Sequence, residues 1–136
     1  MQINTYLLFT GQCEEAFKFY EKLLGGKIEM MMTHEGTPAE DGVPAEWKKK
    51  ILHARLVVGD QVIMASDAPP GRQAKPQGFS VSVSVNEPAE AERIYNGLAE
   101  GALAVTMPIQ ETFWARRFGM LTDRFGIPWM INSEKE

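Results

Sequence analysis

The chain has 136 residues, enough for a domain with a sizeable hydrophobic core. Its formal net charge of -4, with no run rich in lysine and arginine, excludes the footprint of a nucleic-acid-binding protein. A single cysteine, Cys13, excludes an intramolecular disulfide framework and fits a reducing compartment. No apolar run approaches the roughly 20 residues that span a membrane, and no signal peptide is recognisable at the N-terminus. We therefore expect a cytoplasmic domain without nucleic-acid or membrane partners.

The apolar pattern of the first half predicts one strand, one helix and three further strands. Apolar residues at helical spacing begin at Cys13, and Gly25 supplies the stop that ends many helices. Strands are expected over residues 3–9, 27–33, 50–58 and 61–66, with a polar loop over 34–48. The last two strands form a hairpin around Gly59 and Asp60, where glycine at the first turn position suits a type II′ turn.

The same order of elements recurs after a linker rich in proline and glycine at residues 67–78. The sequence FSVSVSV at 79–85 alternates strictly, which indicates a strand. A helix within 87–101 follows, and then strands near 104–107, 113–121 and 127–132. The sequence therefore predicts an α+β fold of two βαβββ halves, about 1–68 and 79–136, in a single domain. Each half is expected to carry its helix on one face of a mixed sheet and a concave cleft on the other.

Strand alternation assigns side chains to the two faces of each sheet. In the 50–66 hairpin the apolar set expected against the helix is Leu52, Ala54, Leu56, Val58, Ile63 and Ala65. The opposite, mixed set is His53, Arg55, Val57, Val62, Met64 and Ser66. In the strand at 79–85 the expected core residues are Phe79, Val81, Val83 and Val85, and Ser80, Ser82 and Ser84 face away. Arginine, histidine and serine among aliphatic side chains on such a face favour a small-molecule pocket.

Four stretches carry a family resemblance that spans essentially the whole chain. They are the end of the first helix, FKFYEKLLGG, and the sequences ILHARLVVGD (51–60), VIMASDAPPG (62–71) and VTMPIQETFWARRFGMLTDRFGIPWMIN (105–132). The chain thereby resembles the vicinal oxygen chelate superfamily, also called glyoxalase/bleomycin resistance/dioxygenase. Within that superfamily it is similar to the PhnB-like branch, whose members are often labelled as resembling 3-demethylubiquinone 3-methyltransferase.

The resemblance implies four strand positions at which metal-dependent members hold His or Glu ligands. Aligned through the helices and turns, these positions are Thr5, Met64, Ser80 and Met130. None is a ligand favoured by divalent zinc, nickel, iron or manganese, whereas thioether sulfur suits soft ions such as Cu(I). We therefore expect no metal and no cofactor. The alternative interpretation, that the methionine simply fills a gap in the core, predicts the same absence of metal.

The methyltransferase label conflicts with the sequence. The chain has no glycine-rich loop between a strand and a helix of the kind that usually cradles S-adenosylmethionine, and it contains neither GxGxxG nor GxxxxGK[ST]. A true methyltransferase is not expected.

His53 and Arg55 are the principal candidates for chemistry or binding. His53 is a candidate general base near neutral pH, although a lone strand histidine more often makes a structural hydrogen bond. Arg55 requires a carboxylate partner, which an anionic ligand, Asp67 or Glu111 would supply.

The strand at 113–121 adds a second candidate group. Trp114 and Arg116 share one face and Phe113 and Arg117 the other, and the pattern leaves open which pair enters the cleft, with a preference for Trp114 and Arg116. A tryptophan beside an arginine is common both at ligand platforms and at dimer interfaces. The expected binding set is His53, Arg55, Met64, Ser66, Ser80, Trp114, Arg116 and Met130.

Two functions from different classes follow from these residues and the resemblance. The first is metal-independent binding or sequestration of a small, partly aromatic or anionic molecule. The second is an enzyme of the superfamily, of isomerase, lyase or dioxygenase type, that uses His53 or Arg55. Because superfamily members commonly assemble their clefts from two chains, a homodimer is expected.

Overall fold

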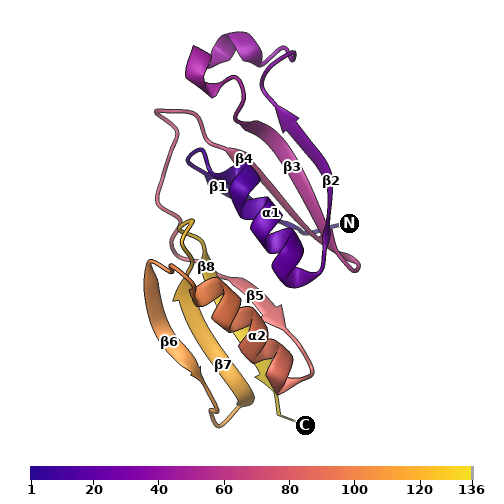
Figure 1. Ribbon diagram of the computed structural model, residues 1–136, viewed down its shortest axis with the longest axis vertical. Coiled ribbons are helices and arrows are strands. Elements are labelled where there is room, and N and C mark those ends of the chain that lie inside the picture. The colour runs from indigo at the N-terminus through magenta and orange to yellow at the C-terminus, as the bar shows by residue number, and fades with distance from the viewer. Residues whose placement is uncertain (136) are drawn as a thin grey trace. The chain divides into compact units, whose positions relative to one another are not determined.

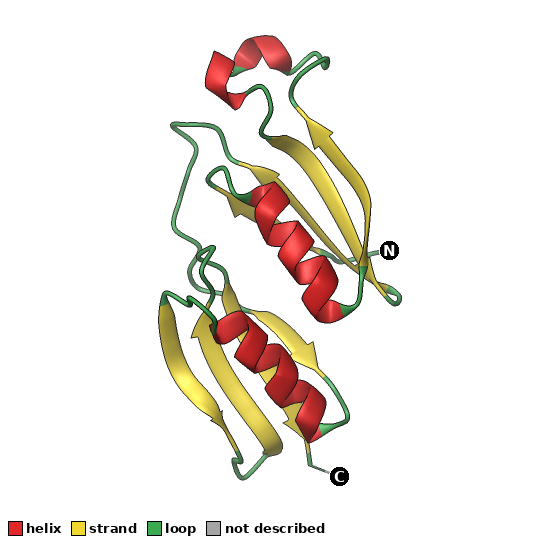
Figure 2. Ribbon diagram, in the orientation of Figure 1, coloured by secondary structure: helices red, strands yellow, loops and turns green. Residues whose placement is uncertain are grey.

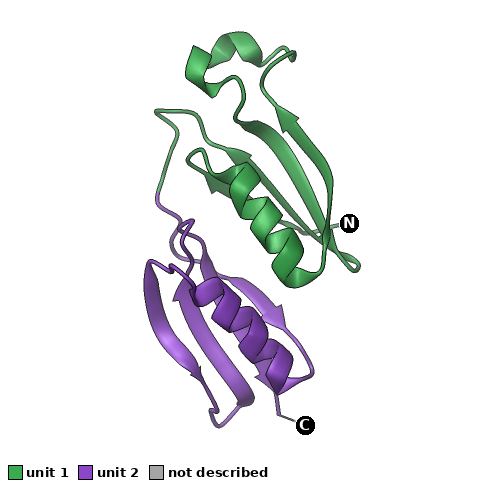
Figure 3. Ribbon diagram, viewed as in Figure 1, with its two compact units in different colours: residues 1–74 green, residues 75–136 purple. Residues whose placement is uncertain are grey.

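The computed structural model describes residues 1–135 and consists of two compact units, residues 1–74 and 75–136 (Figure 3). The first unit contains β1 (Thr5–Phe9), α1 (Cys13–Leu24), β2 (Lys27–Thr33), β3 (Ile51–Val58) and β4 (Gln61–Asp67). The second contains β5 (Val81–Ser84), α2 (Pro88–Ala99), β6 (Ala104–Gln110), β7 (Ala115–Thr122) and β8 (Pro128–Glu134). Short 3-10 helices at Glu40–Gly42 and Ala45–Trp47 interrupt the loop between β2 and β3.

Both units have the same topology. The strand order is β1-β4-β3-β2 in the first sheet and β5-β8-β7-β6 in the second. In each sheet the first strand pairs in parallel with the last, and the other pairs are antiparallel. Each helix lies across one face of its own sheet (Figures 1 and 2). The predicted α+β fold with duplicated βαβββ units is confirmed.

The helix α1 forms where the sequence predicts it, because its apolar side chains fall on one face. Cys13, Ala16, Phe17 and Tyr20 are buried against the sheet. Gly25 adopts the left-handed conformation, with φ 71°, that ends many helices at no steric cost. Helix α2 buries Ala91, Ile94, Tyr95 and Leu98 in the same way.

A buried carboxylate, Asp67, connects the start of α1 to the sheet. Its Oδ1 accepts the backbone N–H groups of Gly11 and Cys13, both at 3.0 Å, and its Oδ2 accepts that of Ile51 at 2.9 Å. The side chain of Gln12 makes no capping hydrogen bond, so Asp67 supplies the negative charge that a helix N-terminus favours. Asp67, one of the partners considered from sequence for Arg55, is therefore engaged with backbone N–H groups instead.

In the second unit a second buried carboxylate, Asp123, organises the turn between β7 and β8. Its Oδ1 accepts the N–H groups of Phe125 and Ile127, both at 2.9 Å, and its Oδ2 accepts the indole N–H of Trp129 at 2.8 Å. Trp129 and Ile131 have no exposed surface and form the core on the helix side of β8. The turn thus fixes the register of the strand that carries Met130.

The burial of two side chains differs from what the sequence pattern indicates. Phe79, expected in the core, is 45% exposed. The strand β5 begins only at Val81, and the alternation of buried and exposed side chains does not extend to residues that precede the strand. His34, the first residue of the loop predicted to be polar, is buried, and its Nδ1 lies 3.0 Å from the carbonyl oxygen of Lys50. The loop around it is folded onto the unit through the buried Trp47. Neither helix among the described residues is long and apolar enough to cross a membrane.

Candidate functional site

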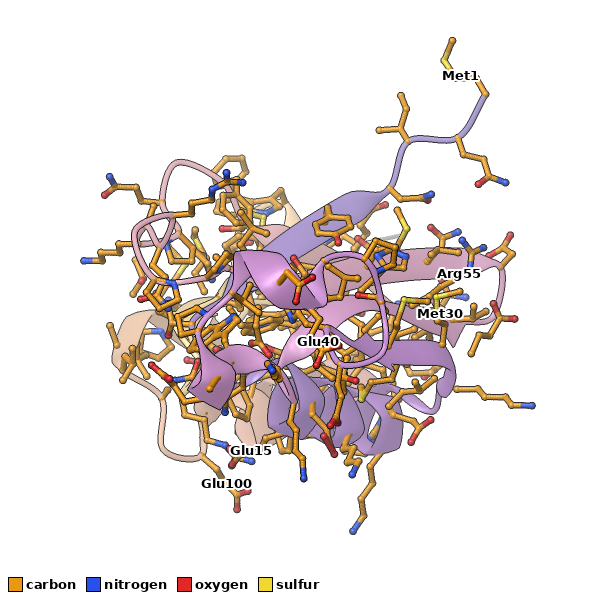
Figure 4. All side chains as sticks on the ribbon, turned by 90° about the horizontal axis from the view of Figure 1, so that it is seen from above. Met1, Glu15, Met30, Glu40, Arg55 and Glu100 are labelled. Atoms are coloured by element: carbon orange, nitrogen blue, oxygen red, sulfur yellow. The ribbon has the colours of Figure 1, made fainter. Side chains whose placement is uncertain are left out.

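The open face of the first sheet, defined as the side away from α1, carries two rows of side chains. The first row, in strand order, is Tyr6, Met64, Arg55 and Met30. The second row is Leu8, Ser66, His53 and Met32, since Ala54 opposite Ala65 places His53 beside Ser66. Four residues expected from sequence to bind a ligand therefore share this one face. Met30 and Arg55 lie next to each other on the first sheet in Figure 4, away from the labelled Glu15 of α1.

Four large apolar or aromatic side chains of the open face are exposed. Tyr6 is 44% exposed, Leu8 52%, Met30 42% and Met32 41%. On the other face Leu7, between Tyr6 and Leu8 in sequence, is buried, and Met31, between Met30 and Met32, is half-buried. Exposed apolar side chains gathered on one face mark a site of interaction more often than scattered ones do. Sequence reasoning missed Tyr6 and Leu8, because every residue of β1 after Thr5 is apolar or aromatic and alternation gives no signal there.

Tyr6 and His53 form a pair across the open face. The Tyr6 hydroxyl lies 3.0 Å from Nδ1 of His53, and the two rings stack with centroids 5.7 Å apart and planes at 21°. A phenol both donates and accepts, so it accommodates either neutral tautomer of the imidazole. The pair fixes the ring of His53, and among the described residues Nε2 has no hydrogen-bond partner. His53 can therefore offer Nε2 to a proton, a ligand or a metal ion.

Arg55 has a protein partner that the sequence did not indicate. Its Nε lies 3.1 Å from Oε1 of Glu29, and the side chains are 35% and 50% exposed. Glu29 stands at an irregularity in the pairing of β2 with β3, between Ile28 opposite Leu56 and Met30 opposite Arg55. A bulge of this kind leaves one residue unpaired and redirects its side chain. Neither partner considered from sequence, Asp67 or Glu111, makes the contact.

One of the four aligned positions, Thr5, lies on the wrong face. Thr5 pairs with Ile63 and shares its side of the sheet with the buried Leu7, whereas Tyr6 pairs with Met64. In the second sheet Ser82 pairs with Met130. Ser82 thus corresponds to Tyr6, and the counterpart of Ser80 is Asn4 rather than Thr5. A shift of one residue in a strand exchanges its two faces, which is why the alignment from sequence failed here.

The open face of the second sheet carries Met130, which lies opposite Met120 and beside Ser82. Ser80 precedes β5 and has the same parity as Ser82. Trp114 is 44% exposed, and its ring centroid lies 5.3 Å from that of Phe118, which pairs with Asn132 in the row next to Met130. Trp114 therefore belongs to the same face as Met130.

The two arginines of β7 go to different places. Arg117 donates to Glu92 of α2 at 2.7 Å, which puts Arg117 on the helix side. Arg116 donates to the backbone carbonyls of Glu134, at 3.0 Å, and Asn86. It lines a surface hollow of about 470 Å³ within the second unit, together with Ser84, Val85, Asn86, Glu87, Glu134 and Lys135. Arg116 is thus held by main-chain oxygens.

The donors present do not fit a zinc, nickel, iron or manganese centre. In the first sheet Tyr6 lies opposite Met64, and in the second sheet Ser82 lies opposite Met130, so each pair offers one hydroxyl and one thioether. Among residues 1–135 no group of three or more His, Cys, Asp or Glu side chains is close enough to hold a metal ion.

The buried titratable groups on the helix sides have no catalytic character. Burial raises the pKa of the Cys13 thiol far above its usual value, and the charges of Asp67 and Glu14 raise it further. Burial likewise raises the pKa of Tyr95, whose hydroxyl donates to the carbonyl of Met107 at 3.3 Å. A thiol in this state is not a nucleophile. Neither Cys13 nor Tyr95 is therefore a candidate for chemistry.

Comparison with known proteins agrees with the resemblance inferred from sequence. The model of the Glyoxalase/Bleomycin resistance protein/Dioxygenase superfamily matches residues 2–131. Protein YjdN of Escherichia coli strain K12 is 34% identical over 144 residues, which cover 100% of this chain and 97% of YjdN.

Solved structures give the same result. Protein PA1353 from Pseudomonas aeruginosa superposes with a TM-score of 0.90 at 50% identity, covering 100% of this chain and 99% of that one. A Bacillus cereus PhnB protein, described as a putative 3-demethylubiquinone-9 3-methyltransferase, superposes with a TM-score of 0.80 at 24% identity, covering 98% and 99%. That second likeness shows the fold alone. The chain belongs to the glyoxalase/bleomycin resistance protein/dioxygenase superfamily, and within it to the YjdN-like proteins.

Proposed function

We propose that this protein binds a small, partly aromatic or anionic molecule on the open face of its first sheet, without a metal ion. The observation that carries the proposal is the placement of Arg55 and the Tyr6–His53 pair among exposed apolar side chains of that face. Ligand sites are mostly apolar surfaces with a few polar groups that fix orientation. Trp114, Ser80 and Met130 offer a similar mixture on the second sheet.

Arg55 is the expected anchor for a carboxylate. Its pair with Glu29 is partly exposed, and such pairs typically contribute only about 0–1 kcal/mol, so a ligand carboxylate can replace Glu29 at little cost. A hydrogen bond to a charged group contributes about 1.5–3 kcal/mol. Because Glu29 competes for the guanidinium, the net gain lies at the lower end. Arg55→Met should therefore weaken the binding of an aromatic acid by about tenfold.

Calorimetric titration with a panel of aromatic carboxylates tests this. Glu29→Gln should strengthen binding, because it removes the competing charge and leaves Arg55 in place. Arg93→Met is the matched control, since Arg93 pairs with Glu90 on the surface of α2 at 2.6 Å and takes no part in the open face. Unchanged affinity in Arg55→Met with a normal melting temperature would mean that Arg55 is structural and the anionic ligand is wrong.

A second candidate function is catalysis, favoured by the hydrogen bond between Tyr6 and His53. An imidazole oriented by a phenol, with Nε2 available, is suited to proton transfer. Turnover of a bound ligand, followed by mass spectrometry and abolished in His53→Gln, would favour this function over binding alone. Methyl transfer is not proposed for this chain.

We expect a homodimer in the cytoplasm. The exposed apolar residues of the open face are of the kind that a second subunit or a ligand covers. Light scattering coupled to gel filtration gives the mass in solution, and a strictly monomeric protein at micromolar concentration would contradict the expectation.

A further inference from the structure

Three methionines lie near His53 on the open face of the first sheet. Met32 lies directly opposite His53 on the neighbouring strand β2. Met30 and Met64 both lie opposite Arg55, two residues along β3 from His53, and so occupy the diagonals. Directly opposite residues have Cβ atoms about 4.5–5.5 Å apart and diagonal ones about 7–8 Å, within reach of long side chains. Three thioethers can therefore approach one imidazole.

The hydrogen bonding of the His53 imidazole is the kind found in metal-binding histidines. Its Nδ1 is engaged by the Tyr6 hydroxyl at 3.0 Å, and Nε2 has no partner among the described residues. A metal-binding histidine almost always uses its other ring nitrogen in such a hydrogen bond, which orients the ring. When Nε2 binds a metal ion, Nδ1 carries the proton and donates it to the Tyr6 oxygen. The phenol accepts that bond without rearrangement.

The methionines are not needed as filling for a core. Met30 and Met32 are 42% and 41% exposed, although methionine usually serves to fill irregular gaps between buried side chains. Met31, between them in sequence, lies opposite Ala54 on the helix side and is half-buried. The neighbouring charges nearly cancel, because Arg55 and Glu29 are 3.1 Å apart. A monovalent cation therefore meets little net repulsion.

We propose that this face binds one soft monovalent cation, Cu(I) or Ag(I), through Nε2 of His53 and the thioether sulfurs of Met32, Met30 and Met64. Thioether sulfur selects soft ions, and a set without carboxylates or thiolates gives little to zinc, manganese or iron. This site shares Met64 with the aligned ligand positions of the superfamily, whereas His53, Met30 and Met32 lie outside that set. It stands whether or not an aromatic acid binds to Arg55.

Silver nitrate in chloride-free buffer is the probe, because Ag(I) is redox-inert and shares the ligand preferences of Cu(I). In protein carrying ¹³C-labelled methionine methyl groups, the signals of Met30 and Met32 should shift and saturate at one equivalent. The signal of Met31 should stay in place. Absence of a saturating shift, or an equal shift of Met31, overturns the site.

Affinity measured by competition with a Cu(I) chelator under anaerobic conditions gives the second readout. Tyr6→Phe should weaken binding by about 10–100-fold, as expected for loss of the bond that orients a histidine ligand. The double variant Met30→Leu with Met32→Leu should lose more, and Met31→Leu should bind as the wild type does. Equal affinities in all variants overturn the proposal. So does binding that leaves every methionine methyl unmoved and disappears in Cys13→Ala, because it assigns the ion to the thiol.

Discussion

Replacement of Asp123 by asparagine should destabilise the second unit through a single hydrogen bond. Asparagine keeps one acceptor oxygen, which can still serve the N–H groups of Phe125 and Ile127. Its amide NH₂ then stands where Oδ2 accepts the indole N–H of Trp129 at 2.8 Å. Two donors would face each other in a place where neither residue has exposed surface. The substitution changes almost no volume, so packing contributes little.

The magnitude follows from two terms. A hydrogen bond to a charged group contributes about 1.5–3 kcal/mol, and a buried donor left without an acceptor costs about 1–3 kcal/mol. These terms overlap, since both describe the same indole N–H, and we expect a loss of about 3 kcal/mol. Domains are typically stable by only about 5–15 kcal/mol, so the effect is large.

Urea denaturation followed by circular dichroism measures the change in the free energy of unfolding. Asp60→Asn is the control, because Asp60 is exposed in the β3–β4 turn and its side chain accepts a hydrogen bond from Gln61, its exposed neighbour. This substitution should change stability by less than about 0.5 kcal/mol. In a Trp129→Phe background the Asp123→Asn substitution should cost clearly less, because no indole donor remains. A loss for Asp123→Asn no larger than that for Asp60→Asn would refute the reasoning.

Three further outcomes are expected. Gly119→Ala should lower the free energy of unfolding by about 1–3 kcal/mol in the same urea assay, because a Cβ there would lie 2.6 Å from Cε2 of Tyr95. The control Gly42→Ala, where a Cβ would have nothing within 4 Å, should be nearly neutral, and equal losses of stability in the two variants would contradict this account. Cys13 should react with iodoacetamide at pH 8 much more slowly in the folded than in the unfolded protein, because the raised pKa of its thiol leaves less thiolate at a given pH. Equal reaction rates in the two states would show that the thiol is accessible in the folded protein. Elemental analysis after dialysis should find well under one equivalent of zinc, nickel, iron or manganese, and a stoichiometric ion would restore metal-dependent chemistry.

Local patterns were sufficient for much of the fold. The helix that begins at Cys13 and ends at Gly25 follows from apolar spacing and from a glycine that adopts positive φ. The hairpin register, with Arg55 opposite Met64, follows from a two-residue turn, and Gly59 has the expected positive φ of 60°. The repeated order of strands and helices predicts the duplicated topology for the same reason, since each signal lies within a few neighbouring residues.

Part of the candidate site could also be placed from sequence. His53, Arg55, Met64 and Ser66 lie on one face because they alternate with apolar residues in a hairpin whose turn fixes its register. The contact between Trp114 and Phe118 puts Trp114 on the face of the second sheet that carries Met130, and its entry into a ligand cleft in preference to Phe113 stays a prediction.

Tertiary structure alone decided the rest. The strand TYLLF is apolar at nearly every position, so only its parallel pairing with β4, distant in sequence, puts Tyr6 rather than Thr5 beside Met64. Glu29 reaches Arg55 only because the pairing of β2 and β3 is irregular at that residue. Periodicity and turn length depend only on residues that are close together in sequence, so both can be recognised before the rest of the fold is known. The face of a uniformly apolar strand, and the partner of a side chain on a bulge, depend on contacts that exist only once the sheet has formed.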